Sequence, residues 1–356
     1  MASKKPSAPR CAAIVGSYLS GKTTLLESIL HTCGATNRKG SVPDGNTVGD
    51  SAPESRARQM SVEMNIATAD YLGEEWTFID CPGSVELQQE ALGAAVIADT
   101  AIVVCEPGAD KALAVTRLMK ELDEMATPYL IFINKMDAAE SHVKETLEAL
   151  QGMTDRPLVL REIPIRDGDA VTGHVDLVSE RAYKWKDGDS SDLIEIPENE
   201  TGREQEERTV LLETLADFND ELLEQLLEDV VPGNEEVYQN LTNDLQEGAI
   251  VPVFFGSAEH ENGIKRLLKA LRHETPEPSA TAERVGISSS GDALAQVFKT
   301  QNGAQSGKLS MVRVWRGEIG DSANLNSDRV SGIFKMLGSQ QNKVIKAVVG
   351  EVVGLG

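Results

Sequence analysis

The stretch CAAIVGSYLSGKTTLLESIL, residues 11–30, decides the fold of this chain. It begins with the apolar run CAAIVG and ends with TTLLESIL, in which apolar residues recur at helical spacing. Between them lies a loop with a glycine at each end, so the sequence predicts a buried strand, a tight turn and a helix in that order. The loop fits the pattern GxxxxGK[ST] of a phosphate-binding loop. Its residues are Gly16, Ser17, Tyr18, Leu19, Ser20, Gly21, Lys22 and Thr23, followed by Thr24.

These residue types suit the binding of a phosphate group. Glycine lets successive backbone N–H groups turn inward around an oxyanion, and the N-terminus of the following helix adds partial positive charge. Lys22 is expected to neutralise the β- and γ-phosphates of a nucleotide, and the Thr23 hydroxyl is expected to bind Mg²⁺. The alternative is a glycine turn without a ligand, which the strand–loop–helix context disfavours.

Outward from this loop, continuous apolar runs alternate with amphipathic segments. The strand-like runs are 76–80, 100–106, 129–134 and 251–256, and the helix-like segments are 86–98, 111–125 and 144–150. This alternation predicts an α/β fold of the P-loop NTPase type, with a mostly parallel sheet and helices on both faces. Right-handed crossovers then bring the loops that follow the strands to one edge of the sheet, where ligands bind.

The composition and hydrophobic pattern of the sequence divide the chain into several regions. Residues 1–10 are expected to be a disordered tail, and residues 11–272 a nucleotide-binding domain interrupted over about 158–247 by an inserted α+β subdomain. Residues 273–284 are rich in proline and charge and predict a linker. Short strand-like runs over 285–356 predict a β-barrel domain. Its last run stops in mid-pattern, so we expect a truncated barrel and a chain that is either the N-terminal part of a longer protein or a truncated product.

Composition excludes several classes of protein. The 356 residues include 34 Lys and Arg against 57 Asp and Glu, and 40% are apolar, which is ordinary for a globular protein. No apolar run approaches a membrane span or a secretory signal, and the four cysteines are scattered without a CxxC pair. These features predict a cytoplasmic protein with no membrane partner. The net charge of −23 argues against sequence-specific or backbone binding of nucleic acid.

The negative charge is concentrated in one segment. Residues 187–247 contain 20 Asp and Glu but only two basic residues, Arg203 and Arg208. Two interpretations stay open: a solvated helical face, or a docking surface for a basic partner.

A second motif, Asn134-Lys135-Met136-Asp137, follows the strand-like run YLIFI. A carboxylate at Asp137 would accept hydrogen bonds from N1–H and the 2-amino group of guanine, whereas adenine lacks that amino group. Asn134 would tie this loop to the phosphate loop, the Lys135 stem would cover the base, and Ser257-Ala258 would supply a backbone N–H to guanine O6. The alternative for the motif alone is a helix cap.

A third motif, Asp80-Cys81-Pro82-Gly83, follows the strand-like run WTFID. Asp80 is expected to hold Mg²⁺ through water, and the Gly83 N–H to meet the γ-phosphate; the alternative is an ordinary turn. Ser61 is a candidate second hydroxyl ligand for Mg²⁺. The poorly patterned segment 31–60 is typical of a switch loop that γ-phosphate and metal would order.

In this order, the phosphate loop, DxxG, NKxD and SA motifs resemble the translational GTPases. The insertion before GSA, and the downstream FKT and GKLSMVRVWRGEIGDSANL, resemble the elongation factor G branch, and the resemblance covers nearly all of residues 10–356. It implies GTP and GDP as ligands, Mg²⁺ as cofactor, the ribosome as partner, a monomer, and a conformational switch driven by the nucleotide. It also implies three further domains after the barrel.

Three departures from the family pattern bear on hydrolysis. Ser84 stands where the family has the histidine that positions water, Leu19 stands where the family usually has aspartate, and the motif RGIT is Arg58-Gln59-Met60-Ser61. Because phosphoryl transfer depends on positioning and electrostatics, a GTPase with Lys22, Gly83 and Ser84 at its catalytic positions is expected to bind GTP but to hydrolyse it weakly.

Two other functions stay open. The first is a GTP-binding regulator that does not turn over, or a truncated paralogue that does not support translocation. The second is an unrelated phosphate-loop enzyme that uses ATP, which the NKMD motif disfavours. The five histidines lie far apart without metal-ligand spacing, and structural or surface roles are expected for them: His31, His142, His174, His260 and His273. Cys81 is expected to be a small residue facing the sheet, with an oxidisable switch thiol as the alternative.

Overall fold

The computed structural model describes residues 8–138, 143–188, 191–303, 307–326 and 328–356. The chain forms two compact units, one made of residues 1–101 and 276–356, the other of residues 102–275. The tail predicted over 1–10 lies largely outside the described residues, but Arg10 is the first residue of a strand and its side chain is buried. No helix in the described ranges is both long enough and apolar enough to cross a membrane.

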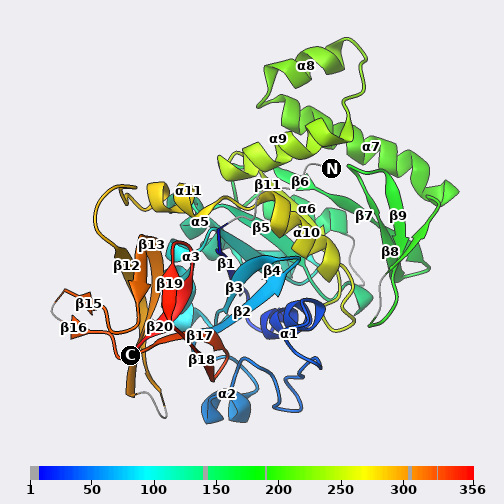
Figure 1. The fold of residues 1–356 in the computed structure, drawn as a ribbon. Helices are drawn as coiled ribbons and strands as arrows, with labels where there is room; N and C mark the ends of the chain where they lie inside the picture. Colours follow the sequence, from blue (N-terminus) through cyan, green and yellow to red (C-terminus); the bar gives the residue numbers. More distant parts are fainter. Residues whose placement is uncertain (1–7, 139–142, 189–190, 304–306, 327) are drawn as a thin grey trace. The chain divides into compact units, whose positions relative to one another are not determined.

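The first unit begins with the predicted strand, loop and helix (Figure 1). Its helices and strands up to residue 101 are β1 (Arg10–Gly16), α1 (Lys22–Thr32), α2 (Pro53–Arg58), β2 (Asn65–Tyr71), β3 (Glu74–Asp80), the short 3₁₀ helix η1 (Val85–Leu87), α3 (Gln88–Ile97) and the start of β4 (Thr100–Cys105). Strands β1 and β3 run parallel and pair Ile14 with Asp80, which brings the ends of both strands to the same edge. Strand β2 is antiparallel to β3 and forms a hairpin with it.

The first unit continues after residue 276 with a helix and a β domain. These elements are α11 (Pro278–Arg284), β12 (Leu294–Gly303), β13 (Gly307–Arg316), β14 (Glu318–Gly320), β15 (Asn324–Leu325), β16 (Asp328–Arg329), β17 (Ile333–Leu337), β18 (Gln340–Val344), β19 (Lys346–Val348) and β20 (Val352–Leu355). The predicted linker over 273–284 therefore contains a helix, which proline opens at its first position. Strand β13 pairs antiparallel with both β12 and β20.

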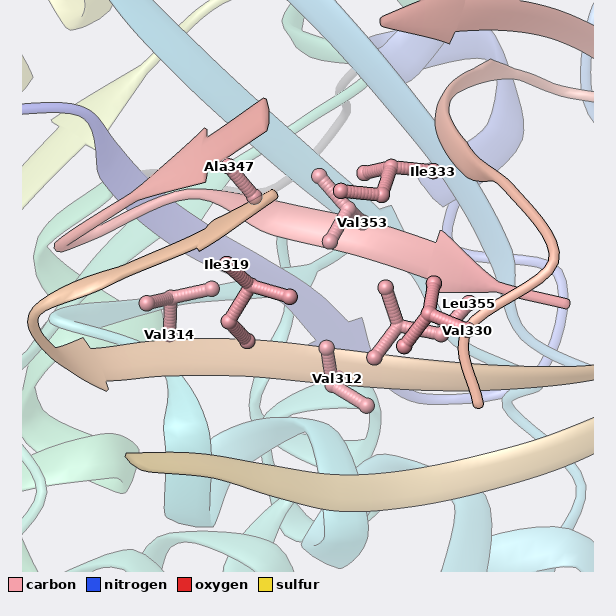
Figure 2. Packing of buried hydrophobic residues seen from close by; sticks show 8 residues of the cluster. All are labelled: Val312, Val314, Ile319, Val330, Ile333, Ala347, Val353 and Leu355. Atoms are coloured by element: carbon pink, nitrogen blue, oxygen red, sulfur yellow. The ribbon is translucent and has the colours of Figure 1, made fainter. Parts of the chain in front are cut away.

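The β domain has its own apolar core, drawn in Figure 2. Alternate residues of β13 point into it because successive side chains of a strand face opposite sides. Its eight buried members are Val312, Val314, Ile319, Val330, Ile333, Ala347, Val353 and Leu355.

The β domain also joins the strands near the phosphate loop. Leu337 of β17 pairs with Ala67 of β2, and the Gly338 N–H donates to the Ile66 carbonyl at 2.9 Å. Gly338 has φ +61°, and a Cβ there would lie 1.9 Å from the Val48 carbonyl oxygen, so only glycine fits this turn.

A buried ion pair fixes the same junction. The Arg313 guanidinium of β13 meets the Asp99 carboxylate at 2.7 Å, and both side chains are fully buried. Asp99 also accepts the Cys11 N–H of β1 and the Thr281 hydroxyl of α11. Three segments far apart in the sequence therefore share one carboxylate.

The second unit carries the remaining parallel strands and the insertion. Its elements are β4 from residue 102 on, α4 (Ala109–Leu113), α5 (Thr116–Glu124), β5 (Tyr129–Ile133), the short η2 (Met136–Ala138), α6 (Val143–Gln151), β6 (Leu158–Leu160), β7 (Glu162–Asp167), β8 (Ala170–Asp176), β9 (Arg181–Lys184), β10 (Asp192–Ile194), α7 (Glu198–Ala216), α8 (Asp220–Leu227), α9 (Asn234–Gln246), β11 (Val251–Phe255) and α10 (Ile264–Glu274). The helix predicted over 111–125 is divided at Ala114 and Val115 into α4 and α5.

The insertion is α+β in composition, as predicted. Strands β7 to β10 form an antiparallel sheet in the order β10-β9-β8-β7, and α7, α8 and α9 follow them (Figure 1). Strand β6, which begins at the predicted boundary of the insertion, pairs parallel with β11, and β11 pairs parallel with β5. In the structure the inserted sheet thus starts at β7. The α/β class with a phosphate loop, an inserted subdomain and a further β domain is confirmed.

Candidate functional site

The phosphate half of the candidate site comprises Gly16 to Thr24 and Asp80 to Gly83, all in the first unit. Gly21 has φ +89° and Leu19 has φ +59°, so the loop turns through left-handed conformations between β1 and α1. The Ser17 carbonyl accepts from the Ser20 hydroxyl at 2.9 Å and from Lys22 Nζ at 2.7 Å. The Lys22 ammonium is thereby folded onto the loop and is 6% exposed.

Gly83 of the DxxG motif lies directly against this loop. A Cβ at Gly83 would stand 2.3 Å from Lys22 Nζ and 2.7 Å from the Ser17 carbonyl oxygen. The Cys81 N–H donates to the Ile14 carbonyl at 3.0 Å, which continues the β1–β3 pairing into the motif. The two motifs therefore meet through backbone atoms, and Gly83 leaves no room for a side chain.

The predicted metal ligands also gather in the first unit. Thr23 Oγ1 donates to Asp80 Oδ2 at 2.7 Å and lies 3.1 Å from Ser61 Oγ. A fourth oxygen donor, Asp50, was not predicted: its Oδ2 lies 3.5 Å from Thr23 Oγ1, and its side chain is 5% exposed. The four side chains form one buried cluster of hydroxyl and carboxylate oxygens.

This donor set fits a magnesium ion. Mg²⁺ prefers oxygen ligands, usually one or two carboxylates together with waters and phosphates. Asp80 Oδ1 is buried without a hydrogen-bond partner among the described residues, as expected of an atom whose ligand is a cation or its water. Burial and the neighbouring Asp50 carboxylate raise the pKa of Asp80 to about 7. A divalent cation would favour the ionised form of both carboxylates.

The segment between α1 and β2, predicted as a switch loop, is tied to α1 by one carboxylate. Glu27 is fully buried, and it accepts the Val48 N–H at 2.6 Å and the Gly40 N–H at 3.0 Å. Burial raises the pKa of Glu27. Sequence reasoning missed this residue because an acid inside an otherwise apolar helix face signals a buried acceptor only when its backbone donors are known.

Ser84 lies at the edge of an open hollow. Its hydroxyl donates to the Glu86 carboxylate, which lowers the pKa of Glu86. A cavity of about 420 Å³ lies beside it. Its lining comes from α2, from the segment between α2 and β2, and from Ser84 with η1, namely Glu54, Arg58, Met60, Val62, Ser84, Glu86 and Leu87. The short serine side chain therefore leaves space at the position where the resemblance implies an imidazole.

The base half of the candidate site comprises Asn134 to Asp137 and Ser257 to Ala258, all in the second unit. The Gly256 N–H donates to the Ile133 carbonyl and the Met136 N–H to the Gly256 carbonyl, so the two loops extend the β5–β11 pairing. The Ala258 N–H donates to Asn134 Oδ1 at 2.8 Å. The N–H that the sequence analysis assigned to guanine O6 is therefore already held by Asn134, and a base would share it or displace the amide.

The exposed side chains of the base half have charged neighbours. Lys135 has φ +62°, and its Nζ lies 2.6 Å from Glu106 Oε1 at the end of β4. Asp137 Oδ2 lies 3.6 Å from His260 Nε2, and His260 Nδ1 lies 3.3 Å from Asp187 Oδ1 of the insertion. The sequence predicted only a structural or surface role for His260, because its contact with Asp137 depends on how the loop after β11 closes.

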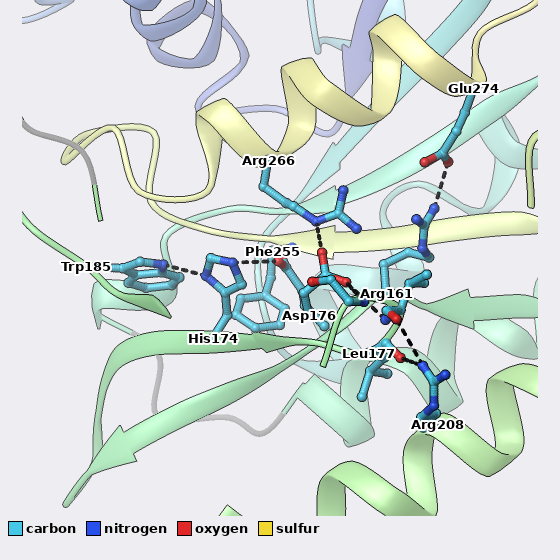
Figure 3. Close-up of polar contacts among 12 residues, drawn as sticks. Arg161, His174, Asp176, Leu177, Trp185, Arg208, Phe255, Arg266 and Glu274 are labelled. Carbon is cyan, nitrogen blue, oxygen red and sulfur yellow. Dashed lines mark hydrogen bonds and ion pairs between the residues drawn. The ribbon is translucent and has the colours of Figure 1, made fainter. Parts of the chain in front are cut away.

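Behind the base half lies a buried polar network that joins the inserted sheet to β11 (Figure 3). The Glu162 carboxylate accepts the Phe255 N–H at 3.0 Å, His174 Nε2 lies 3.6 Å from Glu162, and the Trp185 indole donates to His174 Nδ1 at 2.9 Å. Burial raises the pKa of Glu162 to about 7 and lowers that of His174 to about 4. A neutral His174 fits its role as acceptor from the indole.

Two arginines complete this network. Arg266 of α10 lies 2.7 Å from the Asp176 carboxylate, and Arg161 lies 2.6 Å from Glu274. Figure 3 shows both guanidinium groups between the strands and α10. Because buried charges are costly unless paired, the inserted sheet is fastened to the core of the second unit by complementary charge as well as by apolar packing.

Comparisons with known proteins give a consistent assignment. Residues 8–277 match the model of the elongation factor Tu GTP-binding domain. The chain is 46% identical over 348 residues to an elongation factor G-like protein of Synechocystis sp., covering 97% of this chain and 52% of that protein. It is 28% identical to the mitochondrial ribosome-releasing factor 2 of Mus musculus, covering 94% and 45%.

A crystal structure of a Thermus thermophilus protein superposes with a TM-score of 0.87 at 28% identity, covering 97% of this chain and 52% of that one. The chain thus spans about half the length of the relatives that it matches.

Proposed function

The chain belongs to the GTPase family defined by the elongation factor Tu GTP-binding domain, and we propose that it is a GTP-binding translation factor of the elongation factor G-like type with weak hydrolysis. The family binds guanine nucleotide, and the proposal assigns that role to the phosphate half and the base half of the candidate site. Residues 11–272 would be the GTP-binding domain, followed by a linker over 273–284 and the β domain over 285–356.

In the phosphate half, Lys22 and the loop N–H groups would bind the β- and γ-phosphates. The ammonium would leave the Ser17 carbonyl for phosphate oxygens, a stronger charge-assisted contact. The Gly83 N–H would contact the γ-phosphate. Thr23, Ser61 and Asp80, with Asp50 beside them, would hold Mg²⁺, which would neutralise phosphate charge there.

In the base half, Asp137 would accept from guanine N1–H and the 2-amino group. Asn134 would orient the Ala258 N–H, which would donate to guanine O6. The Lys135 stem would cover the base while its ammonium pairs with Glu106. An adenine base would leave Asp137 without those donors, which favours guanine over adenine by roughly 1–3 kcal/mol. A comparison of GDP and ADP binding by calorimetry tests this assignment and separates it from the ATP-dependent alternative.

The observation that carries weak hydrolysis is the environment of Ser84. Attack of water on the γ-phosphorus breaks its bond to the β–γ bridging oxygen and releases GDP and phosphate, and the attacking water must be oriented and lose its proton. The Ser84 hydroxyl is committed to Glu86, and the space beside it is an open hollow of about 420 Å³. Leu19, 58% exposed, offers no charge at the loop.

A Ser84→His variant tests this point. The hollow leaves room for an imidazole, and a group that positions or accepts a proton contributes about 10²-fold or more to such reactions. We expect the GTP turnover of the variant, measured with and without ribosomes, to exceed that of the native chain at least about tenfold. Unchanged turnover in the variant, or robust ribosome-stimulated turnover in the native chain, would contradict the proposal.

The ribosome is the proposed partner, since one relative is named a ribosome-releasing factor and another an elongation factor G-like protein. We also propose that the protein is cytoplasmic and monomeric.

A GTP-binding regulator that does not hydrolyse GTP is the second candidate, and Ser84 and Leu19, which replace the usual residues of the family, favour it. Co-sedimentation with ribosomes in GTP and in GDP, together with the turnover measurement, separates the two.

A further inference from the structure

We propose that His260 is a positioning residue for Asp137, and that through Asp187 it couples the inserted subdomain to guanine recognition. The inference rests on the proposed function, because it assumes that Asp137 accepts hydrogen bonds from guanine. All three side chains lie in the second unit, and the imidazole stands between the two carboxylates. Its Nε2 lies 3.6 Å from Asp137 Oδ2, and its Nδ1 lies 3.3 Å from Asp187 Oδ1.

The loop that carries His260 is closed by the backbone. Ser257 and Asn262 form an antiparallel bridge, with N–H to carbonyl distances of 3.1 and 2.9 Å in the two directions. Glu261 at φ +60° and Gly263 at φ +81° complete the turn into α10. A Cβ at Gly263 would lie 2.6 Å from the Phe255 carbonyl oxygen, so the turn packs closely against the end of β11. His260 is therefore held at the tip of a fixed turn, beside Asp137.

The chemistry of the pair suits orientation rather than competition. Each carboxylate oxygen has two lone-pair directions, so Asp137 Oδ2 can contact His260 on one side and a base on the other. An unrestrained aspartate rotates about its terminal torsion, and only one orientation of the carboxylate plane directs both oxygens toward N1–H and the 2-amino group together. Contact with the imidazole selects that orientation, which reduces the conformational entropy lost on binding.

Asp187 links this contact to the insertion. It follows Trp185, whose indole is anchored in the buried network of Figure 3, and the next N–H, that of Gly188, points to the His260 carbonyl at 3.5 Å. Lys186, the residue before Asp187, pairs at 2.8 Å with Asp192 at the start of β10, a contact that does not involve His260. A displacement of residues 185–188 alters the second partner of the imidazole and, through it, the orientation of Asp137.

The test compares two nucleotides on the full chain. Inosine diphosphate lacks the 2-amino group of guanine, so it engages Asp137 through N1–H alone. We expect His260→Ala to weaken GDP binding about three- to fivefold, the scale of a partly exposed polar contact, and to weaken inosine diphosphate binding less. The preference for GDP over inosine diphosphate therefore falls, and His260→Gln, which keeps an N–H donor, restores part of it.

A double-mutant cycle tests the link to the insertion. Asp187→Asn should weaken GDP binding by a smaller factor, about twofold, and should have no further effect in the His260→Ala background, because it acts only through the imidazole. Asp192→Asn, at the start of β10, is the matched control and should leave the affinity unchanged.

The outcomes separate this inference from the function on which it rests. If the native chain binds neither nucleotide, the proposed function fails. If the native chain prefers GDP but His260→Ala keeps both the affinity and the preference, His260 does not position Asp137. Additive effects of His260→Ala and Asp187→Asn would overturn the coupling to the insertion.

Discussion

The phosphate half and the base half of the candidate site are built in different ways. In the phosphate half the charged side chains are buried, with Lys22 exposed by 6% and Asp80 by 0%. In the base half they are open to solvent, with Asp137 exposed by 34% and Lys135 by 44%, and each has a charged neighbour. The first half depends on desolvated charge, and the second on orientation at the surface.

The two halves also differ in how far apart their residues lie in the sequence. The phosphate loop is formed by consecutive residues whose turn is set by local torsions, such as that of Gly21. The base half depends on Asn134 meeting Ala258, 124 positions later. Substitutions in the phosphate half should therefore change nucleotide affinity by a large factor, because they leave a buried charge without its partner. Substitutions in the base half should change the affinity by smaller factors, because its charges are partly exposed.

The largest effect is expected from Lys22→Ala in the phosphate half. Loss of the ammonium removes charge-assisted hydrogen bonds to phosphate worth roughly 3 kcal/mol, so GDP affinity should fall about 100-fold or more by calorimetry. Lys111→Ala, an exposed lysine of α4, is the control. Retained affinity in Lys22→Ala would mean that this loop does not bind phosphate.

In the base half, Asp137→Asn should weaken GDP binding about 10- to 100-fold, less than the change at Lys22. The amide presents a donor to the guanine 2-amino group, whereas the 2-oxo group of xanthine can accept from it, so xanthosine diphosphate should gain affinity. Competition calorimetry with both nucleotides measures the exchange of preference, and Asp110→Asn on the exposed side of α4 should show none.

The network behind the base half predicts a pH dependence of stability. Burial lowers the pKa of His174 to about 4, so the unfolded chain takes up a proton near pH 6.5 that the folded chain does not. The contribution of His174 is complete above pH 6.5 and is lost as the pH falls toward 4, with about 2 kcal/mol lost between pH 7 and pH 5.

Glu162, whose pKa burial raises to about 7, acts in the opposite sense: its contribution is complete below its ordinary pKa and is lost as the pH rises toward 7. A comparison of the native chain with His174→Gln therefore isolates the histidine. Urea unfolding at several pH values should show a free energy that falls less steeply toward pH 5 in the variant. Parallel profiles would show that His174 is not held neutral.

A smaller effect than those at Lys22 and Asp137 is expected from Gly83→Ala. The added Cβ would stand 2.7 Å from the Ser17 carbonyl oxygen, so the DxxG loop has to withdraw and the Gly83 N–H loses its aim at the γ-phosphate. We expect GTP affinity to fall about tenfold, on the scale of one hydrogen bond, with GDP affected less. Gly93→Ala, where a Cβ meets only the Phe298 carbonyl oxygen at 4.0 Å, is the matched control.

Sequence patterns predicted those elements whose causes are local. The continuous apolar runs of β1, β3, β5 and β11 and the glycine-bounded loop before α1 were predicted within one or two residues. Strand β2 was not predicted, because NIATADY has no strong alternation and is stabilised by its hairpin with β3. Proline and charge over 273–284 predicted a linker and gave no sign of α11, whose Thr281 hydroxyl donates to Asp99, the partner of Arg313.

The candidate site divides in the same way. Motif spacing identified Thr23, Ser61 and Asp80, which the structure brings into one cluster, and Lys22, whose ammonium lies on the Ser17 carbonyl of the loop. It did not identify Asp50, a carboxylate in a polar segment, or His260, an isolated histidine, because both acquire their neighbours only when distant loops close.

The turn between β17 and β18 has a mechanical consequence. Gly338 fits against the Val48 carbonyl with no space for a methyl group, and Val48 is itself anchored to Glu27 of α1. The helix that follows the phosphate loop, the segment beside it and the β hairpin are thus in serial contact. Any rearrangement of residues 40–48 therefore either moves the β17–β18 hairpin or breaks the contact between Val48 and Gly338. The position of the hairpin depends on the conformation of that segment.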